Sequence, residues 1–125
     1  MEKYSRIKAL ISLDAIRYNF EQMKKNIKEG TKIIAVIKAD AYGHGAVPIA
    51  RMLEEFDYIW GFAAATAQEA LQLRKAGITR PILILGLVFE EYYKKLAEND
   101  VRMAVCDYET AGNLTKLLKQ RAKKV

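Results

Sequence analysis

Four apolar runs recur along this chain, and their repetition constrains the fold more than any other feature. The runs are "KIIAVIK" (32–38), "YIWGF" (58–62), "PILILGL" (81–87) and "VRMAV" (101–105). They are nearly continuous in apolar residues rather than alternating, which is typical of parallel strands whose two faces are both covered. Because a helix-like segment follows each run, the pattern predicts an α/β fold with a parallel sheet.

The segments between the apolar runs carry signals for helix boundaries. Pro48 falls in the first turn of its helix, where its missing N–H does no harm. Thr66 and Glu69 form an [ST]-x-x-E capping box at the start of the next helix, and Gly77 is placed to end it. We therefore expect one helix after each strand, over residues 46–56, 67–76, 89–99 and 108–124.

An opening strand and helix are expected before these units. Residues 7–13, "IKALISL", alternate apolar and polar residues and predict a strand. Asp14 is placed to cap a helix that runs to about Lys28, and Gly30 is placed to end it. The apolar side chains of this helix recur at helical spacing and share one face: Ile16, Phe20, Met23 and Ile27.

Two architectures contain successive strand–helix units of this kind. An open doubly wound sheet that binds nucleotides requires G-x-G-x-x-G after its first strand, and the loop at 43–45 offers only "GHG". A (β/α)8 barrel requires eight units in roughly 250 residues. Four units in 125 residues are half of that number. We therefore expect the N-terminal half of a (β/α)8 barrel.

The composition is that of a folded globular protein of the cytoplasm. The chain is 51% hydrophobic and 29% charged, and it contains no apolar run near the roughly 20 residues needed to span a bilayer. The start "MEKYSRIKAL" lacks the apolar core of a signal peptide. Cys106 is the single cysteine, so it forms neither an internal disulfide nor a cysteine-based zinc site, and we expect a small buried residue there.

The net charge of +6 raises the question of nucleic acid binding. The basic residues are spread along the expected helices and thicken in "KLLKQRAKKV" (116–125), without a basic stripe that alternates with aromatic residues. Solvated helix faces explain this pattern better than a nucleic acid surface does. No metal site is expected either.

Lys38 ends the first apolar run and is the main candidate for chemistry. Alternation along a strand places Ile34, Val36 and Lys38 on one face, with the lysine at the end where barrel enzymes build their active sites. An amine on an apolar floor is desolvated, which favours its neutral, nucleophilic form and a Schiff base with a carbonyl group. On spacing alone, a lysine that only extends to solvent remains the simpler interpretation.

The loop after Lys38 offers further candidates. Tyr42 is placed over the mouth, where its hydroxyl reaches a phosphate or its ring lines a pocket, although it also suits a loop that covers apolar surface. Gly43 and Gly45 permit a tight or left-handed backbone near a ligand or in a plain turn. His44 is the only histidine, and it suits an acid–base role or a structural hydrogen bond.

The whole stretch "AVIKADAYGHG" (35–45) resembles the cofactor-lysine signature of the alanine racemases, A-V-[IV]-K-A-[ND]-A-Y-G-H-G. Aspartate stands at position 40, where asparagine is usual in that family. The resemblance extends over essentially the whole chain, and three further stretches carry it: "ISLDAIRYNF", "EALQLRKAGITRPILILG" and "VRMAVCDYE".

This resemblance implies a chemistry for Lys38. The matching lysine of the family binds pyridoxal 5′-phosphate as a Schiff base and then acts as acid and base on one face of the substrate, while the cofactor serves as the electron sink. A tyrosine acts on the opposite face, and the outcome is the interconversion of L- and D-alanine for the cell wall. Tyr42 matches a family tyrosine near the cofactor, and Val36 and Leu85 match apolar residues that pack beside it.

The resemblance also implies what lies outside residues 1–125. Family members continue with the rest of the barrel and a C-terminal β domain, and the expected "D-T-G-M-x-R-x-G" does not occur before Val125. The opposite-face tyrosine comes from a partner subunit, so a homodimer is implied. We therefore expect an N-terminal portion that is inactive alone. The alternatives are a racemase of serine or another small amino acid, and a half-barrel that binds pyridoxal phosphate without catalysis.

Overall fold

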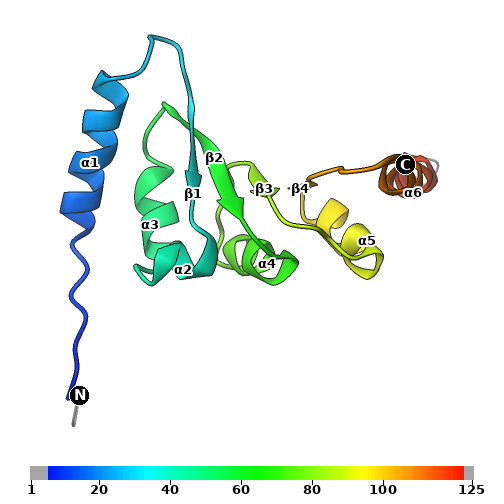
Figure 1. Ribbon diagram of the computed structural model, residues 1–125, viewed down its shortest axis with the longest axis horizontal. Coiled ribbons are helices and arrows are strands. Elements are labelled where there is room, and N and C mark those ends of the chain that lie inside the picture. Colours follow the sequence, from blue (N-terminus) through cyan, green and yellow to red (C-terminus); the bar gives the residue numbers. More distant parts are fainter. Residues whose placement is uncertain (1–5, 123–125) are drawn as a thin grey trace.

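The chain forms a four-stranded parallel sheet in the order β1-β2-β3-β4, and a computed structural model describes residues 6–122 (Figure 1). Each strand pairs with the next one along the sequence. The strands are β1 (Ile33–Val36), β2 (Ile59–Ala64), β3 (Ile82–Ile84) and β4 (Val101–Met103). The prediction of four successive parallel strand–helix units is confirmed.

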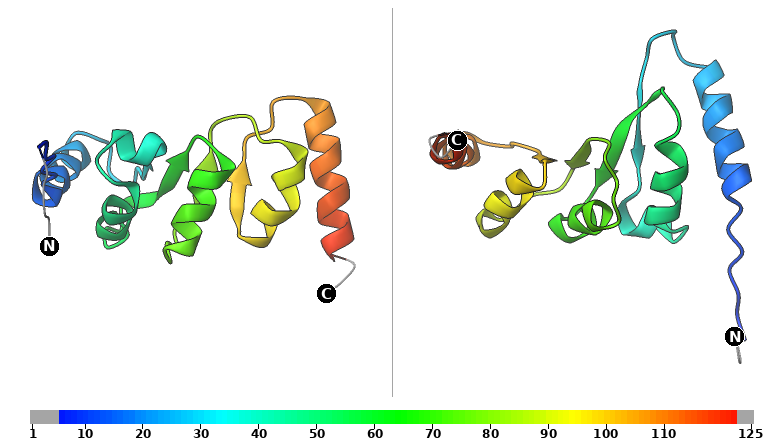
Figure 2. Two further views of the ribbon diagram at one scale, coloured as in Figure 1. Left: turned by 90° about the horizontal axis from the view of Figure 1, so that it is seen from below. Right: turned by 180° about the vertical axis from the view of Figure 1, so that it is seen from behind.

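Helices follow the strands and cover one face of the sheet (Figure 2). They are α1 (Leu13–Lys25), α2 (Lys38–Tyr42), α3 (Ala46–Leu53), α4 (Ala67–Lys75), α5 (Glu90–Glu98) and α6 (Tyr108–Ala122). Helix α1 packs against α3 at one end of the row, and α6 packs against α5 at the other. Within residues 6–122, none of these helices combines the length and the apolarity that crossing a bilayer requires.

Strand register separates a covered face from an open face. One paired row carries side chains that are at most 5% exposed beneath the helices: Ala35, Phe62, Ile82 and Val101. The adjacent row lies on the opposite side, which we call the open face: Val36, Ala63, Leu83 and Arg102. Ile34 and Val36 on this face are 42% and 41% exposed. Helices therefore cover only one side of the sheet, although Ala63 on the open face is buried between its neighbours.

Gly61 allows the strands to approach closely at a bulge. The pairing between β1 and β2 is shifted between Ile33 and Ile34, opposite residues 59–61. A Cβ atom on Gly61 would stand 2.2 Å from the carbonyl oxygen of Pro81, so only glycine fits there. Beside the bulge, the Arg102 guanidinium lies over the Trp60 ring, 4.7 Å from its centroid.

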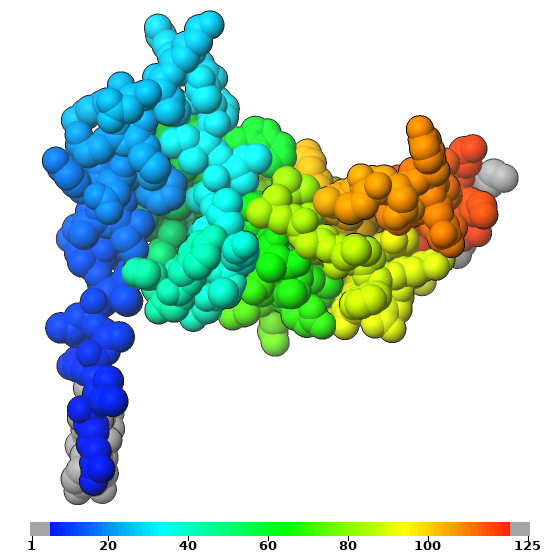
Figure 3. Space-filling model, viewed as in Figure 1, coloured from blue at the N-terminus to red at the C-terminus, as the bar shows by residue number. Residues whose placement is uncertain are grey.

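The expected opening strand is the main correction to the fold. Residues 8–12 have no regular secondary structure, and this segment extends away from the body of the molecule (Figure 3). Ile7 and Leu10 are 90% and 82% exposed, and within residues 6–122 the sheet is made of β1 to β4 alone. The alternating pattern was present, but a strand forms only where a second backbone supplies its hydrogen bonds.

The first helix is also shorter than expected. Ser12, rather than Asp14, is the N-cap, and its hydroxyl accepts a hydrogen bond from the Ala15 N–H at 3.2 Å. Helix α1 ends at Lys25 instead of Lys28, and Gly30 follows with φ of 81° in the connection to β1. Asp14 instead lies in the first turn, where a negative charge favours the helix dipole.

Arginine side chains hold the loops at the amino ends of the strands. The Arg80 guanidinium donates to the carbonyl oxygens of Ile59, Glu54 and Phe56 at 2.7–3.0 Å. The Arg74 guanidinium donates to four further carbonyl oxygens at 2.7–2.9 Å, from Ile78, Arg80, Asn99 and Asp100. Each arginine therefore satisfies backbone acceptors from more than one strand–helix unit.

Glu54 completes this network from the end of α3. Its Oε1 accepts hydrogen bonds from the Thr79 N–H, the Thr79 hydroxyl and the Arg80 N–H at 2.7–3.0 Å. Burial raises the pKa of Glu54, but the backbone hydrogen bonds from Arg80 and Thr79 more than offset that effect. The pKa therefore lies below its ordinary value of 4.5. A lowered folded-state pKa means that the ionised form contributes stability above that ordinary value.

We predict that Glu54→Gln lowers the free energy of unfolding by about 1 kcal/mol or less at pH 7, since charged hydrogen bonds are replaced by neutral ones at a partly exposed site. The difference from the wild type should disappear as the pH falls below the ordinary value of 4.5 and Glu54 becomes protonated. Urea unfolding at neutral and acidic pH measures both effects. Glu55→Gln is the control, since Glu55 contacts Arg17 at 3.5 Å on the surface.

Candidate functional site

Lys38 lies at the carboxyl end of β1, as expected for an active-site residue of a barrel. The strand itself ends at Val36, but the Ile37 N–H still donates to the Ala63 carbonyl at 2.9 Å. Exposure alternates through this segment, because Ala35 and Ile37 are buried, Val36 is exposed and Lys38 is half-buried. The lysine therefore continues the alternation of the open face, although it begins α2 rather than ending a strand over 32–38.

The backbone after Lys38 is a left-handed turn, which no sequence signal predicted. Ala39, Asp40, Ala41 and Tyr42 have φ between 51° and 55°. For the first three of them ψ is 46–48°, so consecutive residues follow a left-handed helix. L-amino acids pay about 1–2 kcal/mol per residue for this conformation, and only glycine adopts it freely. Such strain persists only where neighbouring groups fix it, and it is concentrated at functional sites.

Glu69 of α4 contacts the first amide of this turn. Its Oε1 accepts a hydrogen bond from the Ala39 N–H at 2.9 Å. Its Oε2 accepts from the Ala65 N–H at 2.7 Å and from the Thr66 N–H at 3.3 Å. The Thr66 hydroxyl accepts from the Glu69 N–H at 3.2 Å, so the predicted capping box is present. The sequence predicted this capping box. The hydrogen bond from Ala39 to Glu69 is an additional contact, and it joins two strand–helix units.

Asp40 links the end of the turn to the next helix. Its Oδ1 accepts a hydrogen bond from the Ala46 N–H at 2.8 Å, in the first turn of α3. Its own carbonyl oxygen accepts from the Gly45 N–H, also at 2.8 Å. Gly45 has φ of 92°, which a side chain disfavours. A short acceptor at position 40 therefore replaces the side-chain cap that Gly45 cannot supply.

His44 makes structural hydrogen bonds within the same segment. Its Nδ1 lies 3.0 Å from the Ala41 carbonyl oxygen and 3.2 Å from that of Tyr42. Two carbonyl acceptors require that Nδ1 carries the proton and donates. Of the two roles that the sequence left open for His44, the structure therefore supports the structural one.

The remaining predicted site residues surround the carboxyl end of the open face. Val36 precedes Lys38 by two residues on that face. Leu85 follows β3, where its N–H donates to the Ala64 carbonyl at 2.9 Å, and it is 50% exposed. Tyr42 ends the left-handed turn and is 60% exposed. Ala63 pairs between Val36 and Leu83, so a single methyl group forms the floor between the two bulkier side chains.

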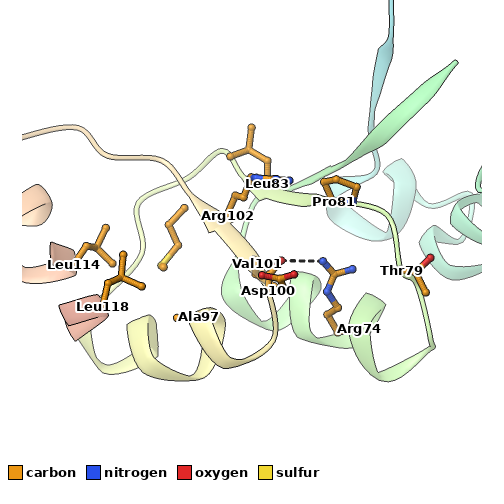
Figure 4. A pocket seen from close by; sticks show the side chains of 11 residues that line it. Arg74, Thr79, Pro81, Leu83, Ala97, Asp100, Val101, Arg102, Leu114 and Leu118 are labelled. Carbon is orange, nitrogen blue, oxygen red and sulfur yellow. Dashed lines mark hydrogen bonds between the residues drawn. The ribbon is translucent and has the colours of Figure 1, made fainter. Parts of the chain in front are cut away.

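A cavity of about 560 Å³ lies elsewhere, beside β4 (Figure 4). Arg74, Asp100 and Leu118 are among its lining residues, and the Arg74 guanidinium donates there to the Asp100 carbonyl at 2.9 Å. Arg74 also binds the loops at the amino ends of the strands. Volume alone would favour this cavity, but the candidate chemistry lies at the opposite ends of the strands.

Comparison with known proteins assigns the chain to a family. Residues 11–125 match the family model described as alanine racemase, N-terminal domain. The chain belongs to this family. The alanine racemase of Lactobacillus acidophilus is 43% identical over 108 residues, which cover 86% of this chain and 28% of that protein.

Solved structures of the alanine racemase family have the same fold. The alanine racemase of Clostridium difficile 630 superposes with a TM-score of 0.86 at 40% identity, over 90% of this chain and 30% of that one. A histidine racemase of Leuconostoc mesenteroides superposes with a TM-score of 0.75 at 31% identity, over 87% of this chain and 29% of that one. The predicted N-terminal half of a (β/α)8 barrel is confirmed. The chain spans less than a third of the length of these relatives.

We predict that Asp40→Ala lowers the free energy of unfolding by about 1 kcal/mol, because the Ala46 N–H loses its acceptor at the start of α3. Asp40→Asn is the matched variant: its side-chain oxygen still accepts that hydrogen bond, and asparagine tolerates positive φ. Thermal unfolding of the two variants measures the difference. An equal loss of unfolding free energy in both variants would contradict the capping role of Asp40. The effect would then be due to the negative charge.

Proposed function

We propose that this chain is the cofactor-binding part of a pyridoxal-phosphate-dependent alanine racemase, in which Lys38 is the residue that binds the cofactor. The observation that carries the proposal is the position of Lys38 at the carboxyl end of β1, beside the open face and directly before the left-handed turn. A lysine that only reached toward solvent would need no such strained backbone after it. Membership of the family supports the same role.

The residues around Lys38 fit pyridoxal phosphate. An aldehyde requires a primary amine that it can approach, and Lys38 is half-buried at the edge of an exposed apolar face. Val36 and Leu85 present aliphatic side chains on that face, suited to packing against an aromatic ring. Tyr42, four residues after the lysine, adds an exposed side chain with a ring and a hydroxyl. These four residues are the proposed cofactor contacts within this chain.

Lys38 has two tasks in the proposed reaction. Its Nζ would hold the cofactor as the attaching amine and would be available for proton transfer once the substrate is bound. The free amine then removes or returns the α-proton on its own face of the substrate. Bound pyridoxal phosphate supplies the electron sink for the carbanion that remains. The base for the opposite face is proposed to be a tyrosine outside this chain.

Alanine is the proposed substrate, and D-alanine for the cell wall is the proposed product, formed in the cytoplasm. The relatives named alanine racemase support alanine. A racemase of another amino acid is the second candidate, because one structural neighbour at 31% identity is named a histidine racemase. We propose residues 1–125 as the N-terminal portion of the barrel domain. The residues that choose between the substrates are then expected in the rest of the family's length.

We predict that the purified chain binds pyridoxal phosphate covalently at Lys38. Titration with the cofactor should give a saturable visible absorption band, and borohydride should fix the cofactor to Lys38 in a peptide map. Lys38→Ala should abolish the band, whereas Lys95→Ala should preserve it, because Lys95 is exposed on α5.

The outcomes separate the proposal from its alternatives. A band that survives Lys38→Ala would refute the role of Lys38. A Lys38-dependent band without conversion of L-alanine fits a chain that binds the cofactor but lacks the second base. A Lys38-dependent band that responds to another amino acid and not to alanine would favour the second candidate.

We also propose that the chain self-associates through its open face. The edge strands β1 and β4 have free edges within residues 6–122, and apolar side chains remain exposed between them. Ile34→Lys should therefore lower the apparent mass in sedimentation velocity at high protein concentration. Tyr18→Lys on α1 should leave the mass unchanged, although Tyr18 is also exposed. A monomer at all concentrations would contradict this proposal.

A further inference from the structure

We infer that Glu69 is a positioning residue for Lys38: its carboxylate fixes the left-handed turn and thereby sets the direction in which the lysine leaves β1. This inference rests on the proposed role of Lys38 as the cofactor-binding amine. Glu69 lies in α4, thirty residues beyond the Ala39 amide that it binds. A residue of the second strand–helix unit therefore orients the reactive group of the first.

Glu69 binds the amide that is closest to Lys38 in the left-handed turn. The Ala39 N–H belongs to the peptide group bonded directly to Lys38, so its direction fixes the rotation about the Cα–C bond of the lysine. Asp40 and His44 stabilise the later part of the segment, through the Ala46 N–H and through the carbonyls of Ala41 and Tyr42. Among the side-chain hydrogen bonds to the turn, the one from Glu69 is the nearest to Lys38.

The two oxygens of Glu69 connect the ends of two neighbouring strands. Oε1 binds the Ala39 N–H after β1, and Oε2 binds the Ala65 N–H after β2. Both partners are N–H donors, so the site requires acceptors on both sides, and an ionised carboxylate supplies them. Oε1 accepts from one N–H and Oε2 from two, those of Ala65 and Thr66, so a glutamine loses the fewest hydrogen bonds when its NH₂ group faces the Ala39 N–H. Glu69→Gln therefore removes one hydrogen bond while it conserves the size of the side chain.

An ordinary helix cap does not require this geometry. The capping box needs only the hydrogen bonds between Glu69 and Thr66 at the start of α4. The same carboxylate in addition binds the strained turn, where four successive residues have positive φ. Thr66→Ala is therefore a matched control, because it removes the hydroxyl that accepts from the Glu69 N–H and leaves the Ala39 contact of the carboxylate intact.

The first measurement is independent of the cofactor. Heteronuclear NMR of the 125-residue chain reports φ of residues 39–42 through scalar couplings, and amide exchange reports protection of the Ala39 N–H. In Glu69→Gln we expect Ala39 exchange to be faster by about tenfold or more, with averaged couplings in the turn. In Thr66→Ala both should remain as in the wild type. An unchanged turn in Glu69→Gln, or equal loss in both variants, would overturn the inference.

The second measurement uses pyridoxal phosphate itself, with borohydride reduction and a peptide map. Glu69→Gln should reduce the fraction fixed at Lys38 several-fold at a subsaturating concentration, and Thr66→Ala should not. Equal fixation in Glu69→Gln and wild type would overturn the positioning role. If the wild type fixes none, the proposed function fails for this chain, while the NMR comparison still decides whether Glu69 holds the turn.

Discussion

The one-sided burial of the sheet is the constraint on which the rest of the structure depends. The helices cover the row of Ala35, Phe62, Ile82 and Val101, and this burial fixes the register of all four strands. Once the register is fixed, the carboxyl ends of β1, β2 and β3 meet along one edge, and every second side chain faces the open side. The place of Lys38 beside Val36, two strands away from Leu85, is a consequence of this packing.

Helix-covered parallel strands also explain how a strained backbone is tolerated after Lys38. The sheet fixes Ile37, whose N–H donates to the Ala63 carbonyl. Helix α4 supplies the Glu69 carboxylate that binds the Ala39 N–H, and α3 supplies the Ala46 N–H that binds Asp40. The turn is thus held at its beginning by Glu69 and at its end by Asp40. Its unfavourable φ values are supported by elements that the core already holds in place.

Features that depend on local sequence pattern were predicted correctly. Features that depend on contacts with distant segments of the chain were not. Continuous apolar runs identified all four strands, and the spacing of Thr66 and Glu69 identified the start of α4. The alternation of 7–13 predicted a strand, but residues 8–12 have no regular secondary structure. "ADAY" (39–42) contains ordinary helix formers, so its left-handed conformation could not be read from composition. Hydrogen bonds to other elements hold that conformation at both ends, through Glu69 and Asp40.

The hydrogen bonds at the two ends of the strands differ in what they hold. At the amino ends, Arg74 and Arg80 donate to backbone carbonyls of the loops that connect successive units. At the carboxyl ends, the hydrogen bonds of Glu69 and Asp40 hold a conformation that costs free energy. A chain gains no stability from a left-handed turn of non-glycine residues. Its presence beside Lys38 fits the proposal that the direction of this lysine, rather than the stability of the loop, determines the local structure.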